Sequence, residues 1–226
     1  MNDRKVRRWA GRFGVAGFIV FLAALLLYFI GVGPAARLED TAQFSSFVAR
    51  TNTFILIRTA LTDPLIMVGR LVFLAGFCYL VRQSRQDYEW IAMLIFGVGL
   101  IVIAIELVGD GLEAGAALDT WVKADPTAVR GLTEGSFPMY GSIGLIMSAL
   151  LLASAGCASL GSAVLHKWTG WLAYAAAVIS LAAAPSILAG TNLTGFYTAS
   201  GYAPFIGQAA MLVWFLASSI SMIVKC

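Results

Sequence analysis

Three carboxylates stand near the end of an apolar stretch in the middle of the chain. The stretch covers residues 88–113, and Glu106, Asp110 and Glu113 lie at positions i, i+4 and i+7 within it. On an α-helix this spacing places all three side chains on one face. An ionisable side chain in a membrane helix is costly, so it faces protein or water and marks a candidate functional site. Neighbouring carboxylates such as Glu106 and Asp110 are also able to act as an acid and a base.

The composition indicates that these carboxylates belong to a membrane protein. Of the 226 residues, 60% are hydrophobic and 12% are charged, and the mean hydropathy is +0.85. A soluble domain has about 45–50% apolar and about 25% charged residues. Several segments approach the ~20 residues that cross a hydrocarbon core of about 30 Å. We therefore predict an all-α fold, a single integral membrane domain over residues 1–226 that forms a six-transmembrane-helix bundle with short interfacial helices on the outer side.

The six predicted spans cover approximately residues 13–33, 64–81, 88–108, 137–160, 168–188 and 204–225. The second span is expected to begin at Asp63 and Pro64, because Asp is a strong N-cap and Pro suits the first helical position. The alternative is a longer second span that extends back to Thr53.

The segments that join the spans on the outer side are not uniformly polar. Residues 34–63 interleave aromatic and aliphatic side chains with Arg50 and Arg58, which predicts a helix lying in the outer interface. Residues 110–134 are acidic and are expected to form a short amphipathic helix on the membrane surface, ending near Asp125. Residues 189–203 form a loop whose tyrosines, Tyr197 and Tyr202, are available as a lid over a cavity.

The distribution of positive charge predicts the orientation. Five of the fifteen basic residues precede the first span, namely Arg4, Lys5, Arg7, Arg8 and Arg12. By the positive-inside rule the N-terminus is cytoplasmic, and six spans return the C-terminus to the same side. The net charge of +3 needs no nucleic acid to explain it, so none is expected as a partner.

The sequence offers little for a metal or cofactor. Its one histidine is His166, and the isolated cysteines Cys78, Cys157 and Cys226 form no C-x-x-C pair. A bis-histidine haem is therefore excluded, and a zinc site is not expected. The sequence also contains no P-loop, dinucleotide fingerprint, G-x-S-x-G or H-E-x-x-H motif. We expect no metal and no cofactor.

Three short stretches carry a resemblance that covers most of the chain. They are residues 128–132 (AVRGL), 140–145 (YGSIGL) and above all 166–172 (HKWTGWL). The pattern resembles a family of uncharacterised bacterial membrane proteins, a domain of unknown function with about six spans. In that family Pro-Arg often precedes the Trp-x-Gly-Trp block, whereas here His166 and Lys167 do. The resemblance implies a topology and a bacterial inner membrane, and it implies no activity.

Depth in the membrane groups the charged residues. Counted from Trp90 at 1.5 Å per residue, Glu106 lies roughly 6 Å below the outer edge of the hydrocarbon core. Counted from Asp63, Arg70 lies roughly 10 Å below that edge. The two side chains are therefore expected to form an ion pair between neighbouring spans.

Two interpretations of this pair stay open. In the first, Arg70 and Glu106 only fix the packing of two helices. In the second, they belong to a polar pocket that opens to the outer side and binds a small amphipathic or lipid-like molecule. The candidate ligand-binding residues are Arg70, Glu106, Asp110, Tyr140, Ser142 and Gln208.

Two further functions are compatible with the sequence. Small residues recur at three- and four-residue spacings in residues 137–160, a pattern that lets helices approach closely. The protein is thus, as an alternative, an accessory subunit that packs against a partner membrane subunit. A second alternative is an intramembrane enzyme that uses the paired carboxylates. Membrane lipids are expected contacts in every case.

Overall fold

The computed structural model describes residues 2–31, 40–122, 124–191 and 195–225, and the regular structure of these residues is helical throughout. Six of the described helical stretches are long and apolar enough to cross a membrane, which confirms the predicted number. They are Asp3–Leu27, Thr41–Ser84, Gln86–Val122, Pro126–Gly161, Lys167–Ala189 and Tyr202–Val224. The predicted ends at residues 32 and 33, the outer segment 34–39 and Cys226 lie outside the described residues.

Eight α-helices and four short helical segments make up these stretches in the described part of the chain. The α-helices are α1 (Asp3–Gly31), α2 (Thr41–Ile57), α3 (Asp63–Ser84), α4 (Glu89–Val122), α5 (Pro126–Pro138), α6 (Gly144–Gly161), α7 (Lys167–Ala183) and α8 (Tyr202–Val224). Segments η1 (Arg58–Thr62) and η3 (Met139–Ile143) are π-helical, and η2 (Gln86–Tyr88) and η4 (Ala184–Ala189) are 3₁₀-helical.

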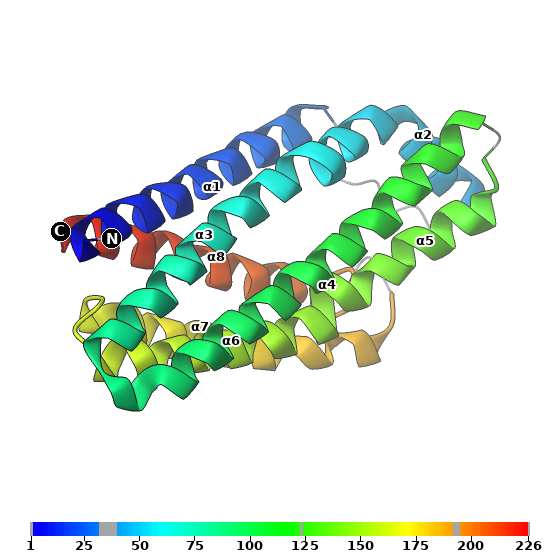
Figure 1. Ribbon diagram of the computed structural model, residues 1–226. Helices are drawn as coiled ribbons and strands as arrows, with labels where there is room; N and C mark the ends of the chain where they lie inside the picture. The colour runs from blue at the N-terminus through cyan, green and yellow to red at the C-terminus, as the bar shows by residue number, and fades with distance from the viewer. Residues whose placement is uncertain (1, 32–39, 123, 192–194, 226) are drawn as a thin grey trace.

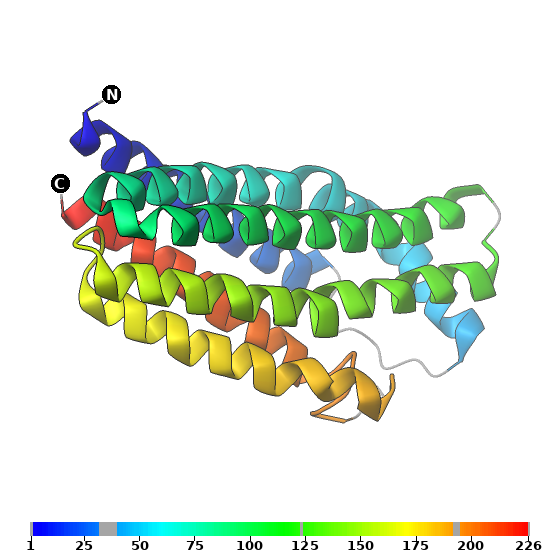
Figure 2. The same cartoon turned by 60° about the horizontal axis from the view of Figure 1, so that its bottom comes forward.

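The helices form one elongated bundle (Figures 1 and 2). Helix α1 packs on α3 and α8, α4 packs on α3, α5 and α6, and α7 packs on α6 and α8. Helix α2 lies at the end of the bundle away from the termini, beside α4 and α5. Both termini lie together at the opposite end.

An aromatic cluster joins α3 to α8 in the interior. The ring of Phe73 lies edge-on to Trp214 at 6.0 Å and to Phe215 at 5.4 Å, and Phe77 stacks on Phe73 at 6.0 Å. Phe73, Phe77 and Trp214 are fully buried. Such aromatic contacts add to the free energy gained by burial, so this cluster helps to hold α3 against α8.

Small residues allow the closest helix approaches. A Cβ atom added to Gly69 of α3 would lie 2.8 Å from the carbonyl oxygen of Phe13 and 3.1 Å from the Cα of Gly17 on α1. The predicted small-residue stripe of α6 packs in the same way, since a Cβ at Gly156 would lie 3.1 Å from the carbonyl oxygen of Gly170 on α7. This stripe is therefore used within the chain.

The start of the second span differs from the prediction. Asp63 has helical φ and ψ of −65° and −42°, so it lies inside a helix and is not an N-cap. Helix α2 runs through η1 into α3 without a break, as the alternative with a longer span requires. The π-turn just before Pro64 accommodates the missing N–H and the ring of the proline, which an α-helix does not tolerate in its interior.

The acidic segment 110–134 also differs, because it forms no separate surface helix. Residues 110–122 continue α4, whose 34 residues give a length of about 51 Å. Helix α5 then starts after Asp125, whose Oδ1 accepts a hydrogen bond of 2.9 Å from the N–H of Thr127. The ends of α4 and α5 and helix α2 share a small apolar cluster of Val48, Ala116 and Val129.

Candidate functional site

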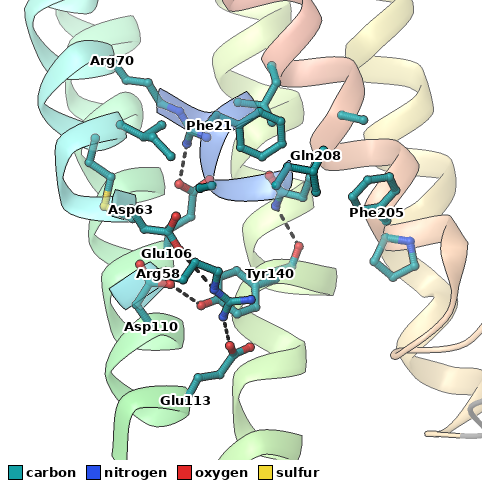
Figure 3. A pocket seen from close by; sticks show the side chains of 17 residues that line it. Phe21, Arg58, Asp63, Arg70, Glu106, Asp110, Glu113, Tyr140, Phe205 and Gln208 are labelled. Carbon is teal, nitrogen blue, oxygen red and sulfur yellow. Dashed lines mark hydrogen bonds and ion pairs between the residues drawn. The ribbon is translucent and has the colours of Figure 1, made fainter. Parts of the chain in front are cut away.

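A cavity of about 400 Å³ lies among α1, η1, α3, α4, η3 and α8 (Figure 3). One wall comes from η1, α3 and α4; it holds the charged residues Arg58, Asp63, Arg70, Glu106, Asp110 and Glu113, together with the apolar side chains of Ile66 and Met67. The facing wall comes from α1 and α8 and is mainly apolar; it includes Phe21, Ala24, Leu25, Phe205, Ala209 and Leu212. The cavity is therefore amphipathic across its width.

The structure brings five of the six predicted site residues to this cavity, namely Arg70, Glu106, Asp110, Tyr140 and Gln208. The described lining does not include Ser142, which is half-buried in η3. Ser142 follows Tyr140 by two residues, and residues two apart on a helix point in nearly opposite directions. The sequence analysis did not anticipate the direction of this side chain.

Arg70 and Glu106 form the expected ion pair between α3 and α4. Nη1 of Arg70 lies 2.5 Å from Oε2 of Glu106, and the two side chains are only 11% and 8% exposed. The guanidinium of Arg70 also lies over the ring of Phe215, 5.7 Å from its centroid. Each charge thus has a partner in a region where an isolated charge would be strongly unfavourable.

Asp110 heads a hydrogen-bond chain that crosses the cavity. The hydroxyl of Tyr140 donates to Oδ1 of Asp110 at 2.5 Å, and Nε2 of Gln208 donates to the backbone oxygen of Tyr140 at 2.8 Å. Tyr140 approaches α4 closely because residue 109 is glycine; a Cβ there would lie 2.8 Å from the tyrosine Cζ. The chain links α4, η3 and α8.

Arg58 and Asp63 line the cavity and were not among the predicted site residues. The guanidinium of Arg58 pairs with Glu113, and its Nε lies 3.6 Å from Oδ2 of Asp63. The hydroxyl of Ser136 lies 3.1 Å from Oε1 of Glu113. Arg58 and Asp63 are five residues apart, a spacing that becomes a neighbouring one only in a π-turn. In the sequence, the five-residue spacing of Arg58 and Asp63 just before Pro64 was the signal that could have placed Arg58 at the site.

Both π-turns contribute directly to the cavity. Arg58 is the first residue of η1 and Tyr140 the second of η3, and the two side chains reach the cavity from different helices (Figure 3). Single π-turns inside α-helices occur frequently at functional sites. A π-turn also interrupts the regular α-helical hydrogen bonds of the backbone. In η3 the side-chain amide of Gln208 donates a hydrogen bond to the backbone oxygen of Tyr140.

Three buried polar atoms of the cavity have no hydrogen-bond partner among the described residues: Arg70 Nε, Glu106 Oε1 and Asp110 Oδ2. Glu106 and Asp110 are 6% and 3% exposed. Buried polar atoms in proteins are nearly always hydrogen-bonded, so exceptions need a specific explanation. Here the atoms belong to residues that line a cavity, where a bound polar group can supply the partner.

The charged and polar residues of the cavity can bind a ligand through ionic contacts and hydrogen bonds. Among the described residues no cluster of three or more His, Cys, Asp or Glu side chains has the geometry to hold a metal ion.

The proposed lid tyrosines do not line the cavity; the hydroxyl of Tyr197 donates to the carbonyl oxygen of Ala182 at 2.6 Å. The backbone N–H of His166 bonds Ser221 near the C-terminal end of α8, whereas the cavity contacts the N-terminal half of that helix.

Comparison of the chain with protein-family models, with curated proteins and with solved structures found no match. The resemblance to a bacterial six-span family therefore stays a prediction, and the function must be inferred from the geometry of the cavity.

Proposed function

We propose that the protein is a multi-pass protein of the bacterial inner membrane that binds a small amphipathic or lipid-like molecule in this cavity from the outer side. The observation that carries the proposal is the opposition of a charged wall on α3 and α4 to an apolar wall on α1 and α8. A molecule with a polar head and an apolar tail satisfies both walls at once. Arg70, Glu106 and Asp110 are its polar anchor.

The size and the position of the cavity support this class of ligand. A volume of about 400 Å³ falls in the range of small-molecule sites, about 300–1,000 Å³. Helices α1 and α8 touch near the termini, where a Cβ at Gly14 would lie 2.0 Å from the hydroxyl of Ser219. Toward the cavity the two helices diverge (Figure 1). The tail of the ligand would lie along the apolar residues that α1 and α8 contribute to the cavity.

The orientation rests on charge. The end of the bundle that carries both termini holds nine basic and three acidic residues, counting residues 1–12, 82–89, 166–167 and 225. An excess of Lys and Arg in short segments is typical of the cytoplasmic side. With that end in the cytoplasm, the cavity faces the outer leaflet.

Neither alternative function gains a comparable observation. The small-residue face of α6 packs on α7 within the chain, as Gly156 and Gly170 show, so it is not free for a partner subunit. The carboxylates Glu106 and Asp110 are engaged by Arg70 and Tyr140 respectively, which suits anchoring better than acid–base chemistry.

A pair of alanines on α1 provides the test. Ala24 lines the cavity, whereas its neighbour Ala23 is exposed on the outside of the bundle. Ala24→Phe should fill the cavity, and Ala23→Phe is the matched control. Native mass spectrometry of gently extracted protein should show a bound amphiphile in the wild type and in Ala23→Phe, and not in Ala24→Phe. Equal retention by the two variants, or a wild type with no specific ligand, would contradict the proposal.

A further inference from the structure

The charged wall of the cavity is not balanced. It holds four carboxyl side chains, Asp63, Glu106, Asp110 and Glu113, and two guanidinium groups. Arg70 pairs with Glu106, and Arg58 contacts Glu113 and Asp63. Asp110 receives a hydrogen bond from the neutral hydroxyl of Tyr140 and lies within side-chain hydrogen-bond reach of Asp63, so two of the four carboxyl groups lie against each other. The wall therefore holds two more carboxyl groups than guanidinium groups.

The unpartnered atoms show the same imbalance. Oε1 of Glu106 and Oδ2 of Asp110 are acceptors without a donor among the described residues, and both residues are more than nine-tenths buried. The two residues lie one helical turn apart on the same face of α4. Nε of Arg70 is a donor without a hydrogen-bond partner among the described residues, but its guanidinium group already forms an ion pair with Glu106.

We propose that the ligand carries a primary ammonium head group on an aliphatic chain, and this inference rests on the proposed function of the cavity. An ammonium group has three N–H donors and one positive charge, so it supplies a donor to Glu106 Oε1 and to Asp110 Oδ2 and places a cation beside the surplus carboxyl groups. The aliphatic chain then lies along Phe21, Leu25, Phe205 and Leu212 of the facing wall.

Other head groups fit this wall less well. A carboxylate or a phosphate presents acceptors to acceptors and adds a negative charge beside carboxyl groups that already outnumber the guanidinium groups. A hydroxyl has one donor for two acceptors. A quaternary ammonium has the charge and no N–H, so it leaves both carboxylate oxygens without a donor.

Three probes of equal chain length separate these possibilities: decylamine, decan-1-ol and decanoate. Each is added to the full-length protein in mild detergent at the same sub-micellar concentration, and the shift in Tm is measured. Decylamine should raise Tm in a saturable way, and the alcohol and the carboxylate should not. In Asp110→Asn the apparent affinity for decylamine should fall at least tenfold. Asp87→Asn is the matched control, because Asp87 is 85% exposed near the termini.

The outcomes separate this inference from the proposed function. If all three probes stabilise the wild type equally and Ala24→Phe abolishes the effect, the cavity binds amphiphiles and the ammonium class is wrong. If no probe stabilises the protein and native mass spectrometry finds no amphiphile, both proposals fail. If Asp110→Asn does not fold, Glu106→Gln replaces it, and unchanged decylamine binding in the folded variant overturns the inference.

A further arm identifies the source of the ammonium group. Phosphatidylethanolamine and phosphatidylcholine carry the same phosphate, so its unfavourable contribution is equal in both, and they differ in the N–H donors of the head group. Selective stabilisation by phosphatidylethanolamine assigns the site to a lipid head group. Stabilisation by decylamine and by neither lipid assigns it to a free amine.

Discussion

Nη1 of Arg70 lies 2.5 Å from Oε2 of Glu106, across the contact between α3 and α4, with both side chains about nine-tenths buried. Removing one partner of such a pair leaves an uncompensated buried charge. Arg70→Met should therefore lower the free energy of unfolding by roughly 3–5 kcal/mol, measured by reversible unfolding of the detergent-solubilised protein.

The double variant Arg70→Met, Glu106→Gln removes both charges and should recover much of that loss, because replacing a whole buried pair is often nearly neutral. It should also lose ligand-dependent stabilisation while remaining folded. A double variant that is no more stable than Arg70→Met would argue against a mutual ion pair. Unchanged ligand binding in the folded double variant would restrict the pair to a role in packing.

The hydrogen bond that the Tyr140 hydroxyl donates to Asp110 gives a second prediction about stability. Tyr140→Phe leaves Oδ1 of Asp110 without its 2.5 Å hydrogen bond, so the free energy of unfolding should fall by about 1–3 kcal/mol. Thermal unfolding against Tyr79→Phe measures the effect, since Tyr79 is 37% exposed on α3. An equal and small change in both variants would show that the bond to Asp110 is not formed.

The glycine contact between α1 and α3 predicts a strong size effect. A Cβ at Gly69 would lie 2.8 Å from a backbone oxygen of α1, so Gly69→Ala should cost about 1–3 kcal/mol through displacement of that helix. Gly97 on α4 is the control, because a Cβ there meets nothing within 4 Å. Gly97→Ala should be neutral or slightly stabilising. Equal Tm values for the two variants would contradict the close packing.

The proposed orientation predicts opposite labelling of two exposed positions. In a cysteine-free background, Gln86→Cys lies in the connection near the termini and Ala128→Cys lies in α5 at the other end. A membrane-impermeant maleimide should label position 128 in intact spheroplasts and position 86 only after lysis. The reverse pattern would place both termini outside and turn the cavity toward the cytoplasm.

The long apolar helices and the Arg70 contact were predictable, and for a physical reason. Helix length and hydropathy are local properties of the chain, and a depth count needs only the rise per residue. The contact between Arg70 and Glu106 followed from that count, since both side chains lay at one level on consecutive spans.

The remainder of the site depended on features that local patterns do not show. Asp63 followed by Pro64 is typical of a helix start, yet the chain passes through this point in a π-turn that aims Arg58 at the cavity. Ser142 was assigned to the cavity from its expected depth, and the direction of its side chain is set by the π-helical segment Met139–Ile143. The extent of α4 beyond Val108 depends on its packing with α2 and α5, which hydropathy does not report.

The two π-turns also determine how the chain tolerates changes in length. One extra residue in a turn rotates the helix beyond it by about 100°. Deleting a single residue from Arg58–Thr62 would restore α-helical spacing and turn Val48 of α2 away from its cluster with Ala116 and Val129. Arg58 would then leave the charged wall although its codon was untouched. The charged groups that line the cavity thus depend on the number of residues in the π-turn as well as on the identity of the lining residues.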